Sequence, residues 1–143
     1  MIAWAIIDTG PLVAYLEARE NAHAWIRELL DEVVLPLHTC EPVLTEALFI
    51  LRRHGRDHRA LFSMLERGAV QVDYAMTRET MMLNEMMSDY ADLPMSLADA
   101  CLVRMAELHP RAEIITLDRH FKMYRTRDRR VLKLCLPPLE KRR

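Results

Sequence analysis

The chain has 143 residues, of which 51% are hydrophobic and 29% charged, so it is long and apolar enough for one globular domain with its own core. No apolar run approaches the roughly 18 residues that a membrane-spanning helix needs, and the first residues lack the pattern of a signal peptide. Three widely spaced cysteines indicate free thiols in a reducing compartment, and three glycines argue against a glycine-rich phosphate loop. We therefore expect a cytoplasmic protein.

The net charge of −1 hides a division of the chain. Residues 1–118 carry ten Lys and Arg against nineteen Asp and Glu, whereas residues 119–143 carry ten against two. A basic C-terminal segment that begins near residue 119 favours contact with a polyanion or with an acidic protein partner. The alternative is a basic end that only keeps the chain solvated.

Short apolar runs alternate with helical patterns along the whole chain. The first run, 3–7, ends in Asp8, and Gly10 and Pro11 then turn the chain into a helix from Leu12. Later strands are predicted at 33–37, 69–72, 113–117 and 131–134, and helices at 21–31, 41–54, 57–66, 77–90 and 96–108. This alternation predicts parallel βαβ units, and therefore an α/β fold that is a three-layer α/β/α sandwich with a mainly parallel central sheet.

Four acidic residues occupy positions where a carboxylate needs an explanation. Asp8 and Asp118 end two apolar strands, at the sheet edge where open α/β proteins bind ligands. Glu46 and Asp99 lie on helix faces that are otherwise largely apolar, where a lone carboxylate is costly. Each also has a purely structural interpretation. The two aspartates at strand ends can cap the following helices, Asp99 follows Ser96 at capping-box spacing, and Glu46 can reach solvent from the edge of its stripe.

Four carboxylates gathered in one place would repel one another unless a cation lay among them. Oxygen ligands without His or Cys suit Mg²⁺ or Mn²⁺, which activate water and stabilise charge in phosphodiester cleavage. If the four acids converge, the sequence therefore predicts a metal-dependent site that acts on phosphodiesters.

Four segments also stand in the order and at the spacing of one nuclease family. They are Ile6-Ile7-Asp8-Thr9-Gly10-Pro11-Leu12, Leu44-Thr45-Glu46-Ala47, Leu93-Pro94-Met95-Ser96-Leu97-Ala98-Asp99-Ala100 and Ile115-Thr116-Leu117-Asp118-Arg119-His120-Phe121. Through them the chain resembles the PIN-domain ribonucleases, in particular the VapC-type toxins of bacterial and archaeal toxin–antitoxin pairs. The basic end after Asp118 is less typical of that family.

The resemblance implies a single PIN-like nuclease domain over residues 1–143, acting as the endoribonuclease toxin of a type II toxin–antitoxin system. It implies catalytic, metal-binding acids at Asp8, Glu46, Asp99 and Asp118, with Mg²⁺ or Mn²⁺ as cofactor. It further implies hydroxyl residues beside the site, Thr9 and Thr116, an RNA substrate and a cognate antitoxin. The charge distribution adds Arg119, Lys122 and Arg125 as candidates for contact with the RNA backbone.

The helix 77–90 is rich in methionine, at Met81, Met82, Met86 and Met87. Methionine side chains repack easily against another surface, so this helix is the predicted contact of a homodimer. Packing within the core of one chain is the alternative.

Two other functional classes are compatible with the same acids. A receiver-like or other phosphoryl-transfer α/β domain also gathers acids around Mg²⁺, but it usually has a second acid near the first strand end, where Thr9 and Gly10 stand. A non-catalytic PIN-like binding module would keep the fold without the chemistry. A metal-binding titration separates the last class from a nuclease.

Overall fold

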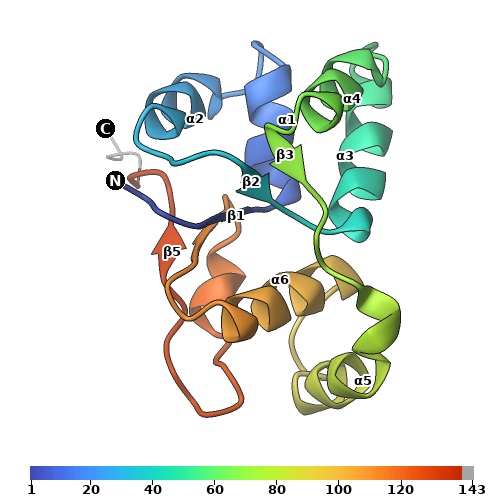
Figure 1. Ribbon diagram of the computed structural model, residues 1–143, viewed down its shortest axis with the longest axis vertical. Helices are drawn as coiled ribbons and strands as arrows, with labels where there is room; N and C mark the ends of the chain where they lie inside the picture. Colours follow the sequence, from blue (N-terminus) through green and yellow to red (C-terminus); the bar gives the residue numbers. More distant parts are fainter. Residues whose placement is uncertain (140–143) are drawn as a thin grey trace.

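A computed structural model describes residues 1–139, in which five short parallel strands form one sheet (Figure 1). The strands follow the order β3-β2-β1-β4-β5 across the sheet. Their bounds are β1 Ala5–Ile7, β2 Leu37–His38, β3 Val70–Gln71, β4 Glu113–Ile115 and β5 Leu134–Cys135. Every neighbouring pair is parallel, as the alternation of strands and helices predicts.

Helices cover both faces of this sheet, which confirms the predicted α/β/α sandwich (Figure 1). In the view of Figure 1, α1 to α4 lie above the sheet, and α5 and α6 lie below it. The α-helices are α1 Thr9–Leu16, α2 His23–Leu30, α3 Glu41–Arg53, α4 Arg59–Glu66, α5 Thr80–Asp89 and α6 Leu97–Leu108. Two 3₁₀ turns are η1 Met76–Arg78 and η2 Arg119–Lys122. No helix within residues 1–139 combines the length and the apolar character that crossing a bilayer requires.

Strand β1 is the centre of the fold because its three residues are fully buried between the two helical layers. Such a strand reads as a continuous apolar run, which is why the first segment could be recognised in the sequence. In the register of β1 with β4, Ile7 lies beside Ile115. The next residues, Asp8 and Thr116, therefore leave the sheet side by side at its carboxyl edge.

Two strands lie later in the chain than predicted. Strand β2 covers Leu37–His38 and not 33–37, because Val34 and Leu35 are exposed and Val33 forms an isolated bridge with Ile2. Strand β5 covers Leu134–Cys135 and not 131–134, because Val131 is exposed and bridges antiparallel to Arg125. An apolar run marked the neighbourhood of each strand, but the partner strand determined its position.

Three helix starts also differ from the expectation. Helix α1 begins at Thr9, so Gly10 lies inside its first turn, where an added Cβ would come within 3.0 Å of the Leu117 side chain. Cys40, not Thr39, precedes α3; the Thr39 hydroxyl instead donates to the Ile7 carbonyl at 2.8 Å. Helix α5 begins at Thr80, after η1, and not at Thr77. Each shift reflects a tertiary contact or a local turn.

Helices α1 and α3 are joined at both ends, and this fixes two of the predicted site residues. At their first turns, the Thr9 hydroxyl donates to Glu46 at 2.8 Å. At their far ends, the buried Glu17 carboxylate accepts hydrogen bonds from Arg19 and from Arg56 at 2.8 Å. These hydrogen bonds hold the pKa of Glu17 well below its usual range, so the carboxylate is ionised.

Candidate metal-dependent nuclease site

Asp8 lies at the carboxyl end of β1 and is 8% exposed. Its Oδ1 accepts from the Thr9 backbone N–H at 2.7 Å, which makes Asp8 the N-cap of α1, as the structural interpretation predicted. Its Oδ2 accepts from the Thr116 hydroxyl on the neighbouring strand end, also at 2.7 Å. The carboxylate therefore caps a helix and faces the end of β4 at the same time.

Asp118 follows Thr116 by two residues and turns back toward the same edge. Its backbone N–H donates to the Thr116 hydroxyl at 3.0 Å, so this one hydroxyl links two of the predicted acids. The Asp118 side chain caps η2 through the His120 N–H and also contacts Nδ1 of His120 at 2.7 Å. Here too, capping and clustering occur together.

Asp99 reaches the site from the first turn of α6 and is 8% exposed. It forms a full capping box with Ser96: Asp99 N–H donates to the Ser96 hydroxyl at 3.0 Å, and Ser96 N–H donates to Asp99 Oδ2 at 3.1 Å. The buried Tyr124 hydroxyl approaches the same oxygen at 3.4 Å. The capping box points the carboxyl group along the helix start, toward the carboxyl edge of the sheet.

Glu46 does not sit on an apolar face as the helix pattern indicated. It is exposed, and so is Phe49 one turn later, whereas Val43 and Ala47 face the core. The hydrogen bond from the Thr9 hydroxyl nevertheless holds the Glu46 carboxylate beside Asp8. The anomaly that singled out Glu46 was therefore wrong in detail, although the residue does lie beside the other acids.

The charges of these acids act on one another. Burial raises the pKa of Asp8 to about 6, against the hydrogen bonds from Thr116 and Thr9, and the charges of Asp99 and Asp118 raise it further. Burial also raises the pKa of Asp99, and the charges of Asp118 and Glu46 add to that effect. The structure thus brings all four predicted acids into one electrostatic neighbourhood.

The donor set of this neighbourhood fits a hard divalent cation. It consists of carboxylate and hydroxyl oxygens, and within residues 1–139 one carboxylate oxygen each of Glu46, Asp99 and Asp118 accepts no hydrogen bond. The described residues nevertheless include no ready group of three or more His, Cys, Asp or Glu placed to hold a metal ion. The acids are therefore neighbours in charge and chemistry, and not a closed ligand cage.

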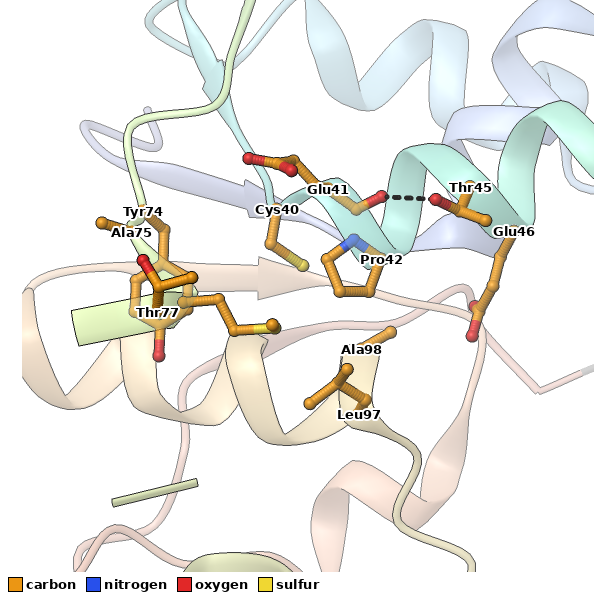
Figure 2. Close-up of a pocket in the computed structure, with 11 residues that line it drawn as sticks. Cys40, Glu41, Pro42, Thr45, Glu46, Tyr74, Ala75, Thr77, Leu97 and Ala98 are labelled. Carbon is orange, nitrogen blue, oxygen red and sulfur yellow. Dashed lines mark hydrogen bonds between the residues drawn. The ribbon is translucent and has the colours of Figure 1, made fainter. Parts of the chain in front are cut away.

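A cleft of about 570 Å³ opens next to these acids (Figure 2). Figure 2 shows Glu46 at one end of it, with the start of α3 on one side and Leu97 and Ala98 of α6 on the other. Tyr74, Ala75 and Thr77 close the opposite end. The cleft has polar and apolar walls and adjoins two of the four acids, since Ala98 directly precedes Asp99.

The basic residues predicted to contact RNA are partly engaged within the chain. Arg119 donates to the Pro137 carbonyl at 2.9 Å, and Arg125 donates to the carbonyls of Lys122 and Tyr124. Lys122 is exposed and forms no ion pair within residues 1–139.

Two residues near the acids were not predicted. His120 contacts Asp118, and its spacing of two residues after a capping aspartate was a usable signal. Tyr124 approaches Asp99, but it stands among basic residues in a segment expected to face solvent or RNA, so nothing in the local sequence indicated its burial. Both lie where they can orient a carboxylate.

Comparisons with known proteins agree with this arrangement. The family model described as the PIN domain matches residues 5–126. The chain is 32% identical over 123 residues to the curated protein Ribonuclease VapC26 of Mycobacterium tuberculosis, covering 84% of this chain and 91% of that protein. The crystal structure of Mycobacterium tuberculosis VapC20, described as a sarcin-ricin loop cleaving toxin, superposes with a TM-score of 0.66 at 18% identity, covering 77% of this chain and 86% of that one. With its acids at the carboxyl edge of a parallel sheet and this match over most of its length, the chain belongs to the PIN-domain family.

Proposed function

We propose that this protein is a metal-dependent endoribonuclease of the VapC toxin type. The observation that carries the proposal is the convergence of Asp8, Glu46, Asp99 and Asp118 from four separate segments in a chain of the PIN-domain family. The related protein named as a ribonuclease and the structural neighbour described as an RNA-cleaving toxin support the same class.

In this proposal Asp8 and Asp99 are the principal ligands of Mg²⁺ or Mn²⁺, and Glu46 and Asp118 complete the site. Such an ion lowers the pKa of bound water and offsets the negative charge that develops on a cleaved phosphodiester. Thr116 holds Asp8 and the Asp118 backbone together, and Thr9 holds Glu46 beside Asp8. Burial of Asp8 and Asp99 keeps bulk water from screening the charges they present.

Incubating the purified chain with total RNA of its host and Mg²⁺ or Mn²⁺, then mapping the new RNA ends, tests the function. We expect cleavage at a restricted set of positions that stops when the metal is chelated. Metal binding in a titration without any cleavage would instead assign a non-catalytic module. The cytoplasm, where RNA substrate is available, stays the predicted location.

An antitoxin is the proposed protein partner, and its chemistry follows from the site. A negatively charged edge attracts a cationic side chain, so an Arg or Lys of the partner inserted among Asp8, Asp99 and Asp118 can take the place of the metal ion. The relation to VapC-named proteins supports the existence of such a partner.

The basic segment after Asp118 is the proposed contact for the RNA backbone, through Arg119, Lys122 and Arg125. Lys122 is the clearest test because it is exposed. Each lost phosphate contact to a single strand lowers the slope of log affinity against log salt by about 0.7. We expect Lys122→Ala to produce such a decrease, measured by RNA binding at several salt concentrations, without changing the melting temperature. Arg127→Ala is the contrasting variant, because Arg127 forms a 2.8 Å ion pair with Glu85 on α5.

The homodimer stays a prediction, but its contact is narrower than the methionine pattern indicated. Met86 is buried in the core, Met82 contacts the Arg127 guanidinium, and Met81 is 77% exposed. If α5 forms a dimer contact, Met81→Glu should convert a dimer to a monomer in sedimentation at tens of micromolar protein. Wild-type protein that sediments as a monomer there would refute the dimer and leave the nuclease proposal untouched.

A further inference from the structure

Helix α3 carries an exposed line of side chains that begins at the proposed active site. Glu46, Phe49 and Arg53 follow one another at helical spacing, and all three are exposed. With a rise of 1.5 Å per residue, Phe49 lies about 4.5 Å and Arg53 about 10.5 Å beyond Glu46 along the helix axis. A strand of RNA that leaves the acids along α3 would meet these two side chains in turn.

Phe49 is an unusual residue at such a position, since its side chain is 63% exposed on a helix whose opposite face is in the core. The guanidinium of Arg53 lies over its ring, 5.9 Å from the centroid. An exposed aromatic face next to an arginine is the combination with which proteins bind single-stranded nucleic acid, because every base can stack on the ring while the cation meets a phosphate.

The charges around Phe49 favour an anionic occupant. Arg52 and Arg53 form no ion pair with any acidic side chain of residues 1–139. In the basic segment, by contrast, Arg127 pairs with Glu85 and Arg130 with Asp128. The last turn of α3 therefore offers positive charge that the folded chain leaves uncompensated, two turns from the acids.

We propose that Phe49 is a stacking platform for an unpaired base of the RNA substrate, and that Arg53 contacts the neighbouring phosphate. This inference rests on the proposed ribonuclease function and names the substrate feature that the site selects. Stacking requires a base that is free of its partner and its neighbours, as in a loop, a bulge or a single strand. A continuous duplex presents its backbone to a protein surface and would not use Phe49.

Binding of a short single-stranded RNA to the full chain, with Ca²⁺ in place of Mg²⁺ to prevent cleavage, tests the platform. Alanine replacement of a stacking aromatic costs roughly 1–3 kcal/mol per base, so Phe49→Ala should weaken binding by about 5- to 100-fold. Phe49→Tyr keeps the ring and should bind like wild type, whereas Phe49→Leu should resemble Phe49→Ala. Phe62→Ala, at an exposed aromatic on α4, is the matched control and should change nothing.

Arg53→Ala should weaken binding less but flatten the salt dependence by about 0.7 in slope, the value for one phosphate contact to a single strand. Replacing the RNA by a duplex of the same sequence should make wild type and Phe49→Ala bind equally. In cleavage assays, Phe49→Ala should raise KM and leave kcat close to wild type, because the chemistry takes place at the acids.

Two results would overturn this assignment. Equal RNA affinity for wild type, Phe49→Ala and Phe49→Leu would show that no base stacks there. A change in sedimentation of Phe49→Ala without a change in RNA affinity would assign the same face to a contact between copies of this chain. Wild-type protein that binds the RNA through Phe49 in Ca²⁺ but never cleaves in Mg²⁺ or Mn²⁺ would refute the ribonuclease and not the platform, so the two failures are distinguishable.

Discussion

Replacing Asp8 or Asp99 with asparagine is expected to lower RNA cleavage by at least about 100-fold while leaving the protein folded. Asparagine keeps the shape and a carbonyl oxygen that can accept the capping hydrogen bonds, so α1 and α6 should still begin where they do. The substitution removes the negative charge that binds the cation. The measurement is the initial cleavage rate of one RNA in Mg²⁺ and Mn²⁺, together with circular dichroism of each variant.

Asp57→Asn provides the matched control, because Asp57 is an exposed aspartate near the start of α4 that accepts from the Arg59 backbone N–H at 2.9 Å. It should cleave RNA at the wild-type rate. Near-normal activity of Asp99→Asn would mean that its role is the capping box alone. Unfolding of that variant would show that the capping hydrogen bonds need the charged carboxylate.

Asp8→Asn is also expected to stabilise the metal-free protein at neutral pH, although it destroys activity. Burial raises the pKa of Asp8 from an ordinary value of 3.8 to about 6. Below pH 4 this side chain is protonated in both states and contributes no difference. Between pH 4 and 6 the unfolded chain releases the proton before the folded chain does, so the free energy of unfolding decreases as the pH rises. Above pH 6 the loss is complete, at roughly 3 kcal/mol for about two pKa units.

Urea unfolding of wild type and Asp8→Asn from pH 4 to pH 8 in a chelator measures this difference. The stability of Asp8→Asn relative to wild type should grow by roughly 3 kcal/mol between pH 4 and pH 6 and then stay level. Other titrating groups, such as Glu17, are common to both proteins and cancel. Parallel curves over the whole range would contradict a buried, raised Asp8.

Metal ions should reverse this cost, since a cation binds the ionised carboxylates. We expect millimolar Mg²⁺ or Mn²⁺ to raise the melting temperature of wild type above pH 6 by mass action, and to do so far less for Asp8→Asn. A wild-type protein indifferent to both ions at pH 7 would count against the site as a whole. These outcomes concern binding and stability, so they remain informative even without a known RNA substrate.

The local pattern of the sequence determined the class of fold and most of the acids. A fully buried parallel strand is a continuous apolar run, so Ile6-Ile7-Asp8 and Ile114-Ile115 mark β1 and β4 by their residue types alone. Asp8 and Asp118 follow those runs, and parallel strands end at one edge of the sheet, so their convergence could be inferred. The capping box of Asp99 was equally local, because it lies within four consecutive residues.

Contacts between distant segments decided the rest. The positions of β2 and β5 depend on pairing with β1 and β4, which no local pattern specifies. The exposure of Glu46 depends on how α3 packs on α1, and its place in the site depends on one hydroxyl, that of Thr9, 37 residues earlier. Tyr124 is buried because the basic segment folds back over α6, and the pairing of Arg127 with Glu85 removes a charge that composition alone assigned to RNA. Local sequence states which side chains carry charge, but the tertiary structure decides which of those charges remain free to act.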